Sequence, residues 1–142
     1  MIEAGIVIAV VAVAAIVVAS VRRRWLVVTV EGNSMAPTLQ HGQRLVAARM
    51  TRSMAPCPGQ IVVFEVERTF GRGDLVHRVK RVAAIAGDPV PAWVRHALGA
   101  PAEARVPPDY IVVAGDNPRS QDSRQLGYVP VRAIVAVVEA QR

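Results

Sequence analysis

The longest apolar run in the chain stands at its N-terminus. Residues 4–21 are 18 positions without a charged side chain, followed directly by Arg22, Arg23 and Arg24. In a helix rising about 1.5 Å per residue, such a run extends about 27 Å and matches the hydrocarbon thickness of a bilayer. A cleavable signal peptide would carry positive charge before its apolar run, whereas the only charged side chain before this run is that of Glu3. The pattern therefore favours a retained single-pass anchor, residues 1–24 with its basic flank.

After the anchor, the pattern changes to short β-branched runs between turn signals. These runs predict strands at residues 26–30, 44–48, 60–66, 75–85, 110–114 and 131–139. Clusters of glycine and proline separate them, including those at 53–59, 71–74 and 87–89. Residues 89–108 are rich in proline and alanine and predict a small insertion or lid, with a short helix at 93–98. Many short strands indicate one mainly β domain over residues 25–142, built as a small barrel-like sheet.

Composition narrows the class of partner. The net charge of +6 favours an anionic membrane surface or nucleic acid. Outside Arg22, Arg23 and Arg24 the basic residues are scattered, and the sequence carries no nucleic-acid-binding motif, so a membrane is the favoured partner. The single cysteine, Cys57, rules out an internal disulfide, and the sequence indicates neither a metal site nor another cofactor.

Ser34 stands where the first predicted strand must end. Gly32 precedes it by two residues and Pro37 follows it by three. A hydroxyl on a tight turn beside free backbone N–H groups is suited to a nucleophile with an oxyanion site. The alternative is that Ser34 only caps the following turn, as serines at such junctions usually do.

Lys80 is the only lysine among the 17 lysine and arginine residues. Arginine stays protonated in proteins, whereas a desolvated lysine can lose its proton near neutral pH. A single lysine in this background indicates a need for a deprotonatable amine, with chance in an arginine-rich composition as the alternative. Arg78 shares strand parity with Lys80, so its charge would help to lower the pKa of the lysine, although desolvation would contribute more.

The three histidines, His41, His77 and His96, are the alternative bases for Ser34. His77 deserves comparison with Lys80, because Ser-His-Asp arrangements are the commoner solution. The two residues have opposite parity on one predicted strand, so only one of them can meet Ser34.

Three motifs follow one another along the chain. They are Gly32-Asn33-Ser34-Met35-Ala36-Pro37-Thr38, then Lys80-Arg81-Val82 running to Gly87-Asp88, and then Gly115-Asp116-Asn117 leading to Ser120-Gln121-Asp122-Ser123-Arg124 and Gly127-Tyr128-Val129-Pro130. In this order they resemble type I signal peptidases, which are membrane-anchored Ser/Lys proteases. The resemblance covers residues 26–138 and implies an antiparallel, barrel-like Ser/Lys peptidase fold after one transmembrane helix.

The resemblance also implies a role for each matching residue. Ser34 would be the nucleophile, Lys80 its base, and Ser120 would orient the lysine amine through a hydrogen bond. A charge pair between Asp122 and Arg124 would brace the loop that carries Ser120, the alternative being a solvated surface pair. Ser123 would support the same loop. Gly32 has no side chain that could bind the oxyanion, so backbone N–H groups, chiefly that of Ser34, would form the oxyanion site.

A substrate chain is expected to lie extended between the first strand and the strand of Lys80, adding itself to the sheet. The expected substrate-binding residues are Val28, Val30, Glu31, His77 and Arg78. The resemblance implies pockets for small side chains, and precursor proteins with signal or leader peptides as partners, together with the lipid bilayer.

The sequence leaves alternatives open for the membrane orientation of the domain and for its function. The positive-inside rule would place the domain after Arg22, Arg23 and Arg24 in the cytoplasm, whereas the resembled family carries its domain on the outer face of the cytoplasmic membrane. The leading function is a membrane-anchored serine endopeptidase. The alternatives are a dedicated maturation protease for one leader-bearing protein, an SOS-repressor-like autoprotease, which would need a DNA-binding helix-turn-helix, and a non-catalytic anchored β module.

Overall fold

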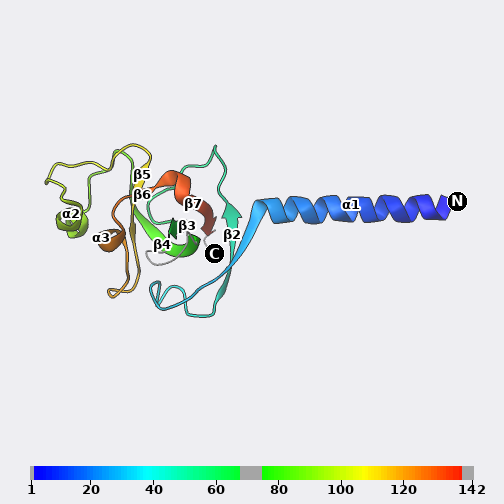
Figure 1. Ribbon diagram of the computed structural model, residues 1–142, viewed down its shortest axis with the longest axis horizontal. Helices are drawn as coiled ribbons and strands as arrows, with labels where there is room; N and C mark the ends of the chain where they lie inside the picture. Colours follow the sequence, from blue (N-terminus) through cyan, green and yellow to red (C-terminus); the bar gives the residue numbers. More distant parts are fainter. Residues whose placement is uncertain (1, 68–74, 139–142) are drawn as a thin grey trace.

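The N-terminal helix projects away from the rest of the chain. The computed structural model describes residues 2–67 and 75–138, and α1, Ile2–Arg24, extends from the β-rich domain as one long helix (Figure 1). Its segment Gly5–Arg24 has a mean hydropathy of 2.6 and buries no residue against the domain, so it is long and apolar enough to cross a membrane. The helix thus fits the predicted anchor.

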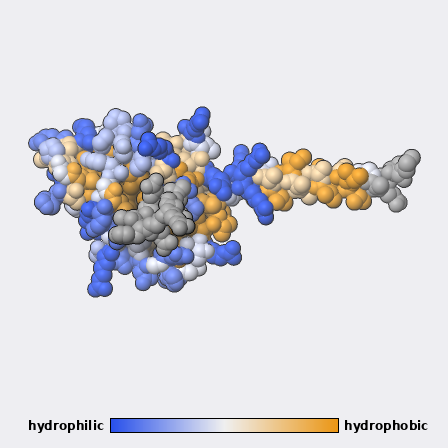
Figure 2. Space-filling model, in the orientation of Figure 1, coloured by the Kyte–Doolittle hydropathy of each residue, from blue (hydrophilic) through white to orange (hydrophobic). Residues whose placement is uncertain are grey.

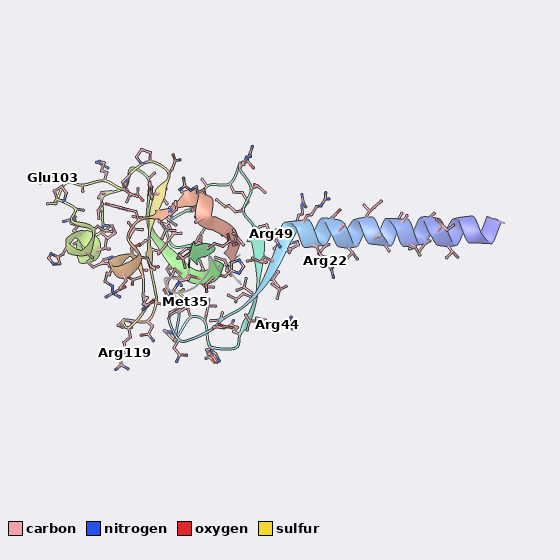
Figure 3. The ribbon with its side chains drawn as sticks, viewed as in Figure 1. Arg22, Met35, Arg44, Arg49, Glu103 and Arg119 are labelled. Atoms are coloured by element: carbon pink, nitrogen blue, oxygen red, sulfur yellow. The ribbon has the colours of Figure 1, made fainter. Side chains whose placement is uncertain are left out.

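A basic band marks the junction between helix and domain. Arg22, Arg23 and Arg24 form the last turn of α1, where a hydrophilic band separates its apolar surface from the domain (Figure 2). Arg49 donates a hydrogen bond from Nε to the Arg22 carbonyl oxygen at 3.4 Å, and both lie where α1 meets the sheet (Figure 3). The basic flank is therefore in contact with the folded domain.

One antiparallel sheet forms the domain. Its seven strands lie in the order β1-β2-β7-β3-β4-β5-β6, and every pairing is antiparallel. The strands are β1 (Trp25–Thr29), β2 (Arg44–Arg49), β3 (Ile61–Glu67), β4 (Leu75–Ile85), β5 (Tyr110–Ala114), β6 (Val129–Pro130) and β7 (Ile134–Val138). The prediction of a mainly β fold preceded by one apolar helix is confirmed.

The sheet curls so that β1, at one edge, faces β4, the fifth strand in the sheet order. Three strands separate β1 from β4 in the sheet order, yet both line the same groove. β4 changes partners along its length, because residues 75–81 pair with β3 and β5 begins to pair only at Arg81. Among the described strands, residues 75–80 of β4 and the outer side of β1 therefore have unpaired backbone edges on the two sides of that groove.

The core holds the turn that carries Ser34. Met35 and Leu39, just after Ser34, are buried in a cluster with Val30 and Leu45. A second cluster joins the segment 89–108 to the sheet, through residues that include Val90, Val94 and Val106 packed against Ala84 and Val112. Apolar burial is what fixes these loops, because it is the main stabilising contribution in folding.

Three short elements differ from the predicted pattern. Residues 131–133, expected as the start of the last strand, form the 3-10 turn η1, Val131–Ala133, which is closed by a hydrogen bond from the Ile134 N–H to the Val131 carbonyl oxygen. Glu139, its predicted end, and the predicted turn at 71–74 lie outside the described residues. α2, Ala92–Leu98, confirms the short helix, whereas α3, Ser123–Leu126, and β6 were not predicted.

Candidate active site

The turn after β1 presents Ser34 at the end of the groove. Gly32 adopts a left-handed conformation with φ of 79°, which glycine reaches without steric cost. The neighbouring loop is closed onto the end of β1, because the Gly42 N–H donates to the Val30 carbonyl oxygen at 2.8 Å and the Val30 N–H donates to the Gln43 carbonyl oxygen at 2.8 Å. Met35, the residue after Ser34, is fully buried and attaches the turn to the core.

Lys80 lies in the middle of β4 and points to Ser34. Its side chain is only 2% exposed, and Nζ lies 2.7 Å from Ser34 Oγ in a hydrogen bond. His77 instead faces Glu65 across the strand pair, with 3.3 Å between Nε2 and Oε1, consistent with the opposite parity of His77 and Lys80. In the described part of the chain, no hydrogen bond joins Ser34 to a histidine side chain.

The surroundings of Lys80 favour its neutral amine. Burial is the largest cause that lowers the pKa of Lys80 from its ordinary 10.5 to about 8, and the positive charge of Arg78 is the second. Asp122 and Asp116 act in the opposite direction, since their charges favour the protonated amine. The sequence-based expectation for Arg78 and for the dominance of desolvation agrees with this order.

Ser120 lies beside the pair but bonds elsewhere. It is 5% exposed, and its Oγ donates to the Gln121 carbonyl oxygen at 3.2 Å. Among the described residues, no hydrogen bond joins Ser120 Oγ to Lys80 Nζ, although the hydroxyl oxygen keeps lone pairs that could accept one. Ser120 also packs against Gly115, where a Cβ would overlap the serine side chain and come within 2.7 Å of the Ser34 carbonyl oxygen.

The loop that carries Ser120 is braced by a buried carboxylate. Arg124 binds Asp122 through two hydrogen bonds of 3.0 Å, from Nε to Oδ1 and from Nη2 to Oδ2. Arg124 Nη2 also donates to the carbonyl oxygens of Pro118 and Ser120 at 3.3 and 3.4 Å. The Asp122 side chain is 2% exposed and that of Arg124 is 37% exposed, so the pair is buried on its carboxylate side and open to solvent on its guanidinium side.

Hydrogen bonding also sets the charge of that carboxylate. Burial alone would raise the pKa of Asp122, but hydrogen bonds from the side chain and backbone of Arg124 and from the backbone of Gly115 hold the pKa below its ordinary value. Next to it, the buried Ser123 Oγ accepts a hydrogen bond from the Val113 N–H at 2.9 Å. Both residues therefore tie α3 to the end of β5.

Two residues that bind the Ser34 turn, Asn117 and His41, were not predicted from the sequence to do so. Asn117 donates from its backbone N–H to the Ser34 carbonyl oxygen at 3.1 Å and from Nδ2 to the Asn33 carbonyl oxygen at 3.0 Å. The Gly115-Asp116-Asn117 motif had marked this residue without assigning it a role. His41 accepts a hydrogen bond at Nδ1 from the Gly32 N–H at 2.9 Å, and no local pattern indicated that contact.

Asp116 fixes the same loop to β4. Its carboxylate binds Arg81 at 2.9 and 2.6 Å, and Arg81 Nη1 also donates to the Gly59 carbonyl oxygen at 2.8 Å. The hydrogen bond from Arg81 is the largest cause that lowers the pKa of Asp116. Since Arg81 follows Lys80 directly, this ion pair holds the 115–117 turn beside the amine.

A groove of about 590 Å³ runs from the Ser34–Lys80 pair between β1 and β4. All five expected substrate-binding residues line it: Val28, Val30, Glu31, His77 and Arg78. Arg78 crosses toward the Ser120 loop, where its Nη1 donates to Gln121 Oε1 at 3.2 Å. Over residues 2–67 and 75–138, no group of three His, Cys, Asp or Glu side chains is placed to hold a metal ion.

Comparison with models of known protein families gives a match over nearly the whole chain. A family model described as signal peptidase, peptidase S26, matches residues 2–93 and 91–141, nearly the whole chain. No curated protein matches the chain at a significant level.

Proposed function

The chain belongs to the signal peptidase family, peptidase S26, and we propose that it is a membrane-anchored serine endopeptidase that removes signal or leader peptides by a Ser34/Lys80 dyad. The observation that carries this proposal is the 2.7 Å contact between Lys80 Nζ and Ser34 Oγ, made by an amine whose pKa is lowered to about 8. An amine with that pKa is partly neutral at physiological pH and can accept the serine proton.

The reaction follows from this contact. Ser34 Oγ attacks the scissile carbonyl carbon as the neutral Lys80 amine takes the hydroxyl proton, and the carbonyl oxygen becomes an oxyanion. When the C–N bond breaks, Lys80 gives that proton to the leaving amine, and the substrate remains as an ester on Ser34. Water then attacks the ester with Lys80 again as the base, which releases the acyl group and restores the serine.

Backbone groups would stabilise the oxyanion. In the described residues, the Gly32 N–H is bound to His41 and the Ala36 N–H to the Asn33 carbonyl oxygen, whereas no protein acceptor is recorded for the Ser34 N–H. The Ser34 N–H lies on the nucleophile itself, so it is the donor best suited to the developing charge. Ser120, Asp122, Ser123 and Arg124 would keep the facing loop in place.

The substrate would bind as an added strand. The outer side of β1 and residues 75–80 of β4 have unpaired edges in the described sheet, so an extended peptide between them can hydrogen-bond to backbone on both sides. Val28 and Val30 line the groove beside β1, and small side chains near the scissile bond are expected from the resemblance to the family. Precursors with Ala-x-Ala-like sites are the expected substrates.

Domain organisation and orientation complete the proposal. Residues 1–24 would be the anchor and 25–142 the peptidase domain, with 89–108 as an insertion packed on it. The domain would lie outside the cytoplasmic membrane, against the preference indicated by Arg22, Arg23 and Arg24. External protease added to intact spheroplasts should digest the domain, and protection until the membrane is opened would place it in the cytoplasm instead.

A cleavage assay tests the function. Detergent-solubilised full-length protein is incubated with a precursor that carries a signal peptide, and the product is located by mass spectrometry. We expect a cut after a small residue with wild type and with Ser53→Ala, a change in an exposed loop, but none with Ser34→Ala. Equal cleavage by wild type and Ser34→Ala would contradict the proposal, as would no cleavage of any precursor in a broad panel.

A further inference from the structure

His41 holds the turn that presents Ser34. The Gly32 N–H donates to His41 Nδ1 at 2.9 Å, across nine positions of the chain. Gly32 is the residue at which the backbone adopts φ of 79° and turns from β1 into the Ser34 loop. Because only one residue separates Gly32 from Ser34, any reorientation of the Gly32 peptide moves the nucleophile relative to Lys80.

The contact specifies the protonation of the imidazole. A nitrogen that accepts an N–H needs a free lone pair, so Nδ1 is bare and the ring proton is on Nε2. In the imidazolium form both ring nitrogens carry protons, and Nδ1 would face the Gly32 N–H with a second donor. Protonation therefore replaces an attractive contact with a repulsive one.

The His41 side chain lies at the surface of the domain. His41 is exposed and belongs to a tight loop in which the Gln43 N–H donates to the Gln40 carbonyl oxygen at 3.1 Å. The two hydrogen-bonded residues have charged residues close to them in the sequence: Glu31 directly precedes Gly32, and Arg44 at the start of β2 follows His41 by three positions. Among the described residues, His41 forms no ion pair. Imidazoles generally take up a second ring proton between about pH 5 and 8.

We propose that His41 is a positioning residue for Ser34, whose neutral ring holds the Gly32 peptide in place and whose protonation releases the turn. The inference rests on the proposed function, because the quantity it alters is the reactivity of Ser34. It adds a loss of activity on the acid side that is separate from the titration of the base, Lys80.

Substitution by asparagine gives a matched test. The Asn side-chain oxygen can stand close to the position of Nδ1 and accept the Gly32 N–H, but it does not titrate. The measurement is kcat/KM for precursor cleavage between pH 5.5 and 9, expressed as the ratio of wild type to His41→Asn, so that the Lys80 titration cancels. We expect a constant ratio above about pH 8 and a fall of about three- to tenfold below about pH 6.

Two further variants separate positioning from other effects. His41→Ala lacks the acceptor, so its kcat should be lower than that of wild type by about three- to tenfold at pH 9, with KM little changed. His96→Asn, in the exposed face of α2, should follow wild type at every pH. A ratio of wild type to His41→Asn that does not vary with pH would overturn the inference, and so would His41→Ala with wild-type kcat.

A spectroscopic measurement keeps the inference testable without a substrate. In ¹⁵N spectra of the full chain in detergent micelles at pH 8.5, the signals lost in His41→Asn should report a bare Nδ1 and a protonated Nε2. A ring protonated at Nδ1 at that pH would overturn the inference even if the peptidase activity is present. Absence of cleavage together with the expected tautomer would contradict the proposed function and leave the contact supported.

Discussion

Lys80 Nζ and Ser34 Oγ lie 2.7 Å apart although 46 positions separate the two residues in the chain. β1, which leads into the Ser34 turn, and β4, which carries Lys80, are separated by three other strands in the sheet order. The contact therefore depends on the curl of the sheet and on the packing of Met35 beneath the turn. Four predictions follow from this pair and its surroundings.

The first concerns the pH dependence. With a pKa of about 8, Lys80 becomes neutral as the pH rises through that value. The pH profile of kcat/KM should therefore have a rising limb over the same pH range. Arg78 is the second cause of the lowered pKa, and Arg78→Gln removes its charge. The pKa of Lys80 should then rise, and the limb should move to more alkaline pH.

Initial rates at low substrate concentration across pH 6–10.5 give the position of the limb independently of its height. Arg132→Gln, on η1, is the matched control because it removes a positive charge outside the groove. An unmoved limb in Arg78→Gln would show that Arg78 does not influence the base.

The second prediction concerns stability. The pKa of Lys80 is about 8 in the folded protein and 10.5 in its ordinary environment. Between these values the unfolded chain binds more protons than the folded one, so wild-type stability rises with pH in this window. Lys80→Met fills a similar volume without a titrating group. At pH 7 it should raise the free energy of unfolding by on the order of 1–3 kcal/mol.

Denaturant unfolding of the full chain in detergent micelles measures this difference. The gap between Lys80→Met and wild type should narrow as the pH rises from 8 toward 10.5. A gap that is independent of pH would mean that the amine is not desolvated in the folded protein.

The third prediction concerns the contact between two loops. Gly115→Ala places a Cβ into the Ser120 side chain and against the Ser34 carbonyl oxygen, so the loops must separate. A displacement of about 1 Å can lower a rate by about a hundredfold, and we expect a loss of that order in kcat. Gly99→Ala is the control, because it strains a left-handed position with φ of 59° at the end of α2 without contacting the site.

Gly99→Ala should therefore lower stability and leave the kcat of the folded protein unchanged. If Gly115→Ala also keeps its kcat, the packing of Ser120 against Gly115 has no part in positioning Ser34.

The features that could be predicted from the sequence are those that residue type and strand parity determine. Alternating parity separated His77 from Lys80, the isolated lysine marked the candidate base, and the β-branched runs located most strands. The family match confirms the resemblance to type I signal peptidases. The unpredicted helix α3 had a readable signal, since Asp122 and Gln125 form a capping box with the spacing expected at a helix start.

Contacts between distant loops could not be predicted in the same way. Asn117 binds the Asn33 carbonyl oxygen across 84 positions, and His41 binds Gly32 only because a tight loop returns the chain to β1. The bond from the Ser120 hydroxyl to the Gln121 carbonyl oxygen depends on loop geometry rather than on residue type. Such contacts require the folded backbone.

The fourth prediction tests the central claim most directly, by precursor cleavage with Lys80→Arg at pH 8–10. Arginine keeps the positive charge but cannot lose its proton in this range, so the variant lacks the base while its β domain should still unfold cooperatively. We expect cleavage to fall by about 10²–10⁴-fold or more, as in Ser34→Ala. Cleavage by Lys80→Arg at the wild-type rate would remove Lys80 from the mechanism and return His77 as the candidate base.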